Sequence, residues 1–122
     1  MLPTVHTFEL RNTFDVVQAR QCARELARDL GFGLTDQTRF ATAVSEIARR
    51  TIEGDSEGTV RFTVLSRGSR QGLECTCLGG SQLRAPRGPI PGGILGGVER
   101  LVDDFEFESS DGEAVIVLRK WL

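Results

Sequence analysis

Two charged residues one helical turn apart, Glu46 and Arg50, have the spacing that most directly suggests chemistry. They lie in the stretch SEIARR, within a segment whose apolar residues recur at helical intervals. Residues four apart in a helix lie one above the other, so both side chains can face one site. Taken by itself, the spacing indicates an exposed ion pair, which stabilises a helix by only about 0.3–0.5 kcal/mol.

Residues 79–97 form a glycine-rich stretch, GGSQLRAPRGPIPGGILGG, with seven glycines, three prolines, two arginines and no carboxylate. Glycine-rich loops bind phosphate because their backbone N–H groups can approach the anion closely. The prolines weaken this interpretation, since each one removes a donor and stiffens the chain. Arg84 and Arg87 can attract an anion, although exposed arginines are more often merely solvated. The residues alone leave open both a phosphate loop and a simple connector.

The cysteines and the single histidine offer little catalytic chemistry. Cys75 and Cys77 lie two residues apart on an expected strand, so they point together toward a core, and no second ligand pair accompanies them. With Cys22 they make an odd set of three, which we expect to stay reduced. No sequence pattern places a nucleophilic side chain beside His6. We therefore expect no metal site and no catalytic pair built on His6.

Length and composition indicate one globular domain and exclude several classes of protein. The chain has 122 residues, of which 26% are charged and 39% hydrophobic. A net charge of −2 with dispersed basic residues argues against nucleic-acid binding. No apolar stretch approaches the ~20 residues that span a bilayer, and the N-terminus lacks a signal-peptide pattern. We expect a cytoplasmic protein that binds neither membrane nor nucleic acid.

Hydrophobic periodicity predicts the elements that position these residues. In order, they are a strand at 5–10, helices at 13–30 and 35–52, strands at 60–64 and 73–77, a helix at 94–105, and two C-terminal strands joined through 110–112. Asp15 or Thr13 is expected to cap the first helix and Thr35 the second. The order βααββαββ favours an α/β (α+β) two-layer sandwich, with one mixed sheet covered on one face by helices.

This element order, with SEIARR on the second helix and a strand that ends in glycine at residue 79, resembles the histidine-kinase-like (GHKL) ATPase superfamily and its Bergerat fold. The C-terminal stretch LGGVERLVDDFEFESSDGEAVIVLRKWL adds to the resemblance. Within the superfamily, TRFATAVSEIARRTI is most similar to the small serine kinases and anti-sigma factors of the RsbT type, from bacterial partner-switching pathways. The resemblance implies a single domain over residues 1–122, with a shortened ATP lid at 79–97.

The resemblance gives Glu46 the place of a catalytic base or water-orienting group. It gives Arg50 the place of an asparagine that holds Mg²⁺. A guanidinium has no acceptor atom and a permanent positive charge, so Arg50 cannot bind the metal. Arg50 can instead contact phosphate directly or neutralise Glu46, and both roles stay open.

Two further departures concern the nucleotide. Gly79 stands where the superfamily has an aspartate that accepts a hydrogen bond from adenine, and no Asp or Glu occurs from residue 75 to 98. The resemblance also implies a phosphate-wrapping glycine motif in the lid. Four glycines fall near it with altered spacing, after a short proline-containing segment: Gly92, Gly93, Gly96 and Gly97.

Three parts of one implied site therefore depart from the pattern together. We expect a regulatory protein-interaction module of a partner-switching pathway, with nucleotide binding lost or weakened, no cofactor and no metal. ATP bound without ordinary Mg²⁺ coordination stays open. Expected partners are an STAS-domain protein, a phosphatase or a sigma factor, with a homodimer as a further option. Arg20, Arg24 and Arg28, on the polar side of the first helix, are candidate contacts.

Two alternatives to this function remain. The first is an active ATP-dependent serine kinase that uses Glu46 and phosphorylates an STAS-domain antagonist. The second is a regulatory domain of a longer signalling protein. Phosphotransfer to an STAS-domain protein separates the first alternative from an interaction module, and the length of the native reading frame separates the second.

Overall fold

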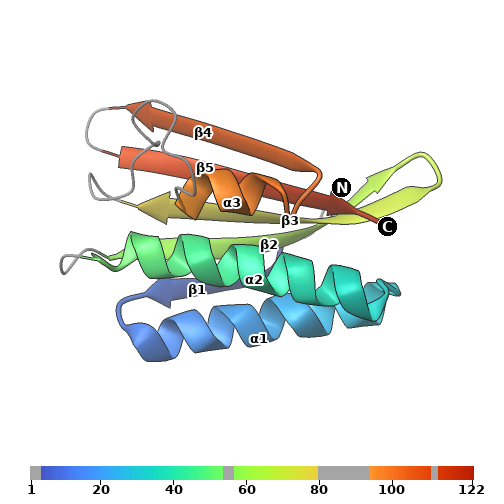
Figure 1. The fold of residues 1–122 in the computed structure, drawn as a ribbon, viewed down its shortest axis with the longest axis horizontal. Coiled ribbons are helices and arrows are strands. Elements are labelled where there is room, and N and C mark those ends of the chain that lie inside the picture. Colours follow the sequence, from blue (N-terminus) through green and yellow to red (C-terminus); the bar gives the residue numbers. More distant parts are fainter. Residues whose placement is uncertain (1–3, 54–56, 80–93, 111–112) are drawn as a thin grey trace.

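The structure is a computed structural model that describes residues 4–53, 57–79, 94–110 and 113–122. The elements in chain order are β1 (Thr4–Leu10), α1 (Thr13–Leu30), α2 (Leu34–Thr51), β2 (Gly58–Arg67), β3 (Arg70–Gly79), α3 (Ile94–Glu99), β4 (Asp104–Ser110) and β5 (Glu113–Trp121). One five-stranded sheet is covered on one face by the helices (Figure 1). The predicted two-layer sandwich and its order βααββαββ are confirmed. Among the described helices, none is both long enough and apolar enough to cross a membrane.

The sheet has the strand order β1-β2-β3-β5-β4, and every pairing between these strands is antiparallel. The expected mixed sheet is therefore wrong. The pair α1 and α2 carries the chain along the sheet and back, so β2 enters antiparallel to β1. β4 runs parallel to β3, since both are antiparallel to β5, but β5 lies between them. No parallel pair forms for that reason.

The helix boundaries depend on caps that differ from the expected ones. Asn12 caps α1: its side-chain oxygen accepts a hydrogen bond from the Asp15 N–H at 3.1 Å. Asp15 in turn accepts from the Arg11 N–H at 2.9 Å, so it completes a reciprocal cap instead of starting the helix. α2 starts after Gly33 without a side-chain cap, which leaves Thr35 inside its first turn.

The third helix is shorter than the sequence predicts. α3 ends at Glu99 instead of continuing to residue 105. Tight turns follow it, in which the N–H groups of Arg100 and Leu101 donate to carbonyls three residues earlier, at 3.3 and 2.9 Å. The helical pattern fails here because β4 begins at Asp104 and draws Phe105 into the sheet, opposite Leu118 of β5.

The core lies between the helix pair and the sheet. Phe40 of α2 packs edge to face on Phe62 of β2, with ring centroids 6.4 Å apart, and Phe62 makes a similar contact with Phe8. The predicted apolar face of α2 is confirmed, since most of its members are fully buried: Phe40, Ala43, Val44, Ile47 and Ala48. His6 is exposed and stacks on Phe8.

All three cysteines are free thiols within this core, as the sequence predicts. Burial, with a smaller contribution from Glu25, raises the pKa of Cys22 to about 11. Burial also raises the pKa of Cys75 well above its ordinary value, helped by a hydrogen bond with Cys77. The thiolate is the reactive form, so the raised pKa values of Cys22 and Cys75 favour a structural role for these two buried side chains.

At pH 8, native protein should react with the thiol reagent DTNB far more slowly than urea-unfolded protein. About one Cys22 thiol in a thousand is ionised three pH units below its pKa, and the core shields all three sulfurs. Absorbance at the thionitrobenzoate band measures both rates, and the unfolded sample should release three equivalents. A native thiol that reacts at the unfolded rate would show that a cysteine is accessible.

Candidate functional site

The flank of α2 carries the two charged residues that the sequence singles out. The Glu46 carboxylate accepts from Arg49 Nη2 at 2.6 Å, and Arg50 Nη1 donates to Glu53 at 2.9 Å. One of the two roles expected for Arg50 was to neutralise Glu46. In this structure Arg50 pairs with Glu53 instead. Residues three apart on a helix are as close as residues four apart, so each arginine meets a different carboxylate. The Glu46 side chain remains one-third exposed, at 33%.

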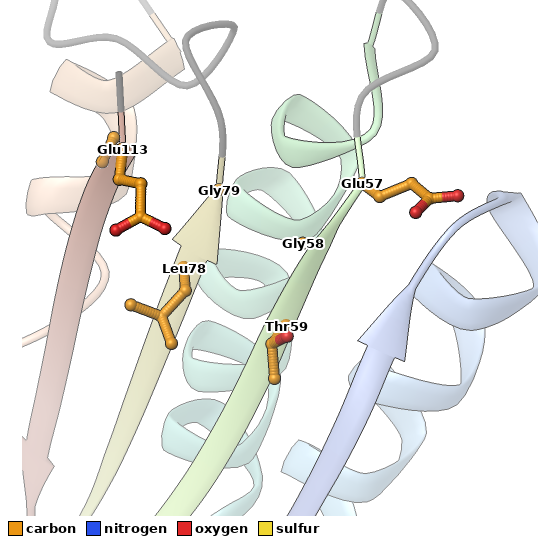
Figure 2. Close-up of a pocket in the computed structure, with 7 residues that line it drawn as sticks. Glu57, Gly58, Thr59, Leu78, Gly79 and Glu113 are labelled. Atoms are coloured by element: carbon orange, nitrogen blue, oxygen red, sulfur yellow. The ribbon is translucent and has the colours of Figure 1, made fainter. Parts of the chain in front are cut away.

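A pocket of about 430 Å³ lies where β2 and β5 begin and β3 ends (Figure 2). Its described lining residues are Glu57, Gly58, Thr59, Leu78, Gly79, Glu113 and Ala114. Gly79 pairs with Gly58 on one side and with Ala114 on the other. Three strands therefore place a row of small residues across this end of the sheet.

The close approach of α2 explains the glycine in β2. A Cβ atom at Gly58 would overlap the Leu78 carbonyl oxygen and the Thr51 methyl group. Thr51 is fully buried in the last turn of α2, where its hydroxyl donates to the Ile47 carbonyl at 2.9 Å. Because neither the strand carbonyl nor this buried methyl can move easily, only glycine lets the end of α2 lie against β2.

The charged groups that line the described part of this pocket are both carboxylates. Glu113 lies beside Gly79, whereas the Glu57 side chain points away from it (Figure 2). The remaining described lining contributes the Thr59 hydroxyl, apolar side chains and backbone. Because like charges repel, the Glu113 carboxylate makes this part of the pocket more suitable for a neutral or cationic group than for a polyphosphate.

Comparison with known proteins identifies the lineage. No protein-family model matches the chain. The chain is 34% identical over 127 aligned positions to the serine/threonine-protein kinase RsbT of Bacillus subtilis (strain 168), and the alignment covers 89% of this chain and 90% of that protein. The chain belongs to the RsbT family. This agrees with the branch that the sequence resembles.

Among the expected site residues that the structure of this RsbT-family chain describes, only Gly79 lies in the pocket. Gly79 lines it, whereas Glu46 and Arg50 on the flank of α2 are not among its described lining residues. Gly97 is exposed on α3, in the same helix as Gly96. Gly92 and Gly93 lie outside the described residues. Sequence reasoning missed Gly58 and Ala114. They become neighbours of Gly79 only through the register of the strands, which no local motif predicts.

A second hollow of about 330 Å³ lies between α1 and α2 of the RsbT-family fold. It is lined by Arg20, Gln21, Arg24, Thr38, Ala41 and Thr42. Among the described residues, neither Arg20 nor Arg24 has a carboxylate within 4 Å, whereas Arg28 meets Asp29 at 3.4 Å. The expected basic side of the first helix is therefore present, and two of its arginines border one hollow.

Replacing Gly58→Ala should lower the free energy of unfolding by roughly 1–3 kcal/mol, because the new methyl group overpacks the contact between the end of α2 and β2. Gly97→Ala is the matched control. Gly97 is exposed on α3 with nothing within 4 Å of an added Cβ, so stability should stay equal or rise by about 0.5–1 kcal/mol. Urea unfolding monitored by circular dichroism measures both. A Gly58→Ala protein as stable as the parent would contradict the close approach.

Proposed function

We propose that this RsbT-family chain is a cytoplasmic regulatory module of a bacterial partner-switching pathway, which acts by protein contact and has lost or weakened ATP binding. One observation carries the proposal. Gly79, at the position where the GHKL resemblance implies an adenine-binding aspartate, lines a pocket whose described charged groups are both carboxylates. Gly79 itself supplies no side chain that could accept a hydrogen bond from adenine, and the described lining contains no cation for phosphate.

The chemistry at Gly79 supports weakened adenine recognition. Glycine has no side chain, so the adenine amino group would depend on backbone or a bridging water for its hydrogen bond. A site built to hydrogen-bond one group discriminates strongly, and the loss of that partner removes most of the selectivity. Phosphates placed in the described part of the pocket would also approach the Glu113 carboxylate. Repulsion between these charges opposes binding.

The flank of α2 supports the loss of ordinary Mg²⁺ coordination. Arg50, at the position where the resemblance implies a metal-binding asparagine, is held by Glu53 at 2.9 Å. A guanidinium supplies donors only, and Mg²⁺ requires oxygen ligands. Glu46 is likewise engaged by Arg49 at 2.6 Å, so it would have to leave that partner to act as a base.

The partner classes come from the resemblance. An STAS-domain antagonist, a regulated phosphatase and a sigma factor are the proteins that such modules contact, and a homodimer is a further option. For a contact-based regulator, mutations that abolish nucleotide chemistry should leave partner binding intact. The proposed mode of action differs from that of a kinase in this respect.

An active ATP-dependent serine kinase is the second candidate function. It is favoured by the 34% identity to a serine/threonine-protein kinase, which covers most of both chains. Glu46 would then leave Arg49 and act as the base, and Arg50 would contact phosphate in place of the metal. The kinase candidate predicts that the chain binds ATP, whereas the proposed function predicts that ATP binding is lost or weakened.

Under the proposed function, millimolar ATP or ADP should leave the melting temperature unchanged, with or without Mg²⁺. A ligand at about 100 times its dissociation constant would stabilise the native state by about 2.7 kcal/mol, which thermal-shift measurements detect easily. Labelled ATP should likewise transfer no phosphate to a co-encoded STAS-domain protein.

Paired variants separate the two candidate functions. If Arg50 replaces the metal, ATP should stabilise the parent equally with and without Mg²⁺, and Arg50→Asn should abolish the metal-free shift. Arg49→Asn, one position away on the same helix, is the control that keeps Arg50. Phosphotransfer that Glu46→Gln abolishes would establish the kinase and overturn the proposed function.

A further inference from the structure

The last residue of β5, Trp121, lies on the face of the sheet that the helices leave open. Its neighbour Lys120 is buried and reaches Asp36 of α2, with 3.5 Å between Nζ and the carboxylate. Successive side chains of a strand point to opposite faces, so Trp121 points away from the helices. This surface is separate from the strand-end pocket, which lies at the other end of β5.

The indole ring is held in one position. Gly72 pairs directly with Trp121, and a Cβ at Gly72 would lie 2.7 Å from the ring carbon Cε3, so the missing side chain leaves room for the ring. The indole N–H donates to Asp104 at 3.1 Å, and the Trp121 backbone N–H donates to Asp103 at 2.7 Å. A ring fixed in this way loses little conformational entropy when a partner binds.

Two arginines from the β2–β3 hairpin flank this ring. Arg67 and Arg70 pair directly across the turn, where Gly68 adopts a left-handed φ of 61°. Their guanidinium carbons lie 5.0 and 5.3 Å from the Trp121 ring centroid. Within the described part of the chain, no carboxylate lies within 4 Å of either guanidinium. The hairpin therefore carries two positive charges directly opposite each other, an arrangement that destabilises it unless an anion binds there.

We propose that the Arg67–Arg70–Trp121 cluster docks a short acidic segment of a partner protein. A carboxylate bound by these guanidiniums would offset their positive charge and accept paired hydrogen bonds from planar forks. Stacking on the indole orients these forks before binding. Tryptophan and arginine are also the residue types most enriched at the energetic centres of protein interfaces.

The surrounding charges select a protein segment over a polyanion. Asp103 and Asp104 border the cluster at the indole N–H edge, where they are exposed. A nucleic-acid backbone would bring further phosphates toward these carboxylates, whereas one or two glutamates or aspartates can reach the arginines alone. This inference rests on the proposed function in one respect: a module that acts by protein contact needs a docking surface.

Intrinsic fluorescence tests the proposal directly, because Trp121 is the only tryptophan and the chain has no tyrosine. A synthetic peptide of alanine and glutamate should change the emission of Trp121 in a saturable way. The isosteric peptide of alanine and glutamine, at matched ionic strength, should not. Raising the salt concentration to about 0.5 M should weaken the binding of the glutamate peptide, since salt screens exposed charges.

The double variant Arg67→Gln with Arg70→Gln should weaken this binding at least about tenfold, as expected for the loss of charge-assisted hydrogen bonds. Arg61→Gln, an exposed arginine on β2 outside the cluster, is the matched control and should bind like the parent. Urea unfolding checks that both variants are folded.

Three results would overturn the docking proposal: equal binding of the glutamine peptide, undiminished binding by the folded double variant, or tighter binding of an oligothymidylate than of the glutamate peptide. None of these measurements involves nucleotide turnover. Failure here, together with an absent ATP shift, would therefore sink the docking surface and leave the proposed function standing.

Discussion

Burial of the apolar face of α2 against the sheet is the constraint on which the rest of the structure depends. Phe40, Val44 and Ile47 are fully buried, and Phe40 meets Phe62 edge to face. These side chains permit one rotational setting of the helix, because any other setting would expose them to water. The same setting places Glu46 and Arg50 on the flank, where each pairs with a neighbour on its own helix.

The end of the same helix shapes the strand-end pocket. Thr51 lies so close to β2 that only glycine fits at position 58, and the paired Gly79 and Ala114 continue the row of small residues. The resulting hollow is lined by backbone, small side chains and two carboxylates in its described part. Packing thus places this pocket at Gly79, the position to which the resemblance assigns the contact with adenine.

Much of the fold follows from local patterns in the sequence. The order of the elements, the buried face of α2 and the reduced core cysteines depend on periodicity, which acts within a few residues of each position. The predicted helix caps, the predicted length of α3 and the predicted mixed sheet were wrong. For the caps and for α3, the reason is that neighbouring signals compete. Asn12 competes with Asp15 for the cap of α1, and the pairing of β4 with β5 ends α3 early.

The candidate site was less predictable than the fold. Gly79 was found from its place at the end of a strand, but Gly58 and Ala114 join it only through the register of strands distant in sequence. The ion-pair partner of Arg50 could not be predicted from the sequence either, since carboxylates three residues ahead and four residues behind are both within its reach. Such choices depend on side-chain geometry that a helical pattern does not encode.

Titration calorimetry of the purified chain with Mg-ATP tests the proposed loss of nucleotide binding most directly, since it needs neither a partner nor a protein substrate. We expect no saturable heat of binding up to millimolar nucleotide, because Gly79 supplies no side chain for adenine and the described lining contains no cation. Saturable binding of one equivalent of Mg-ATP with micromolar affinity would contradict this interpretation and would restore the kinase as the favoured function.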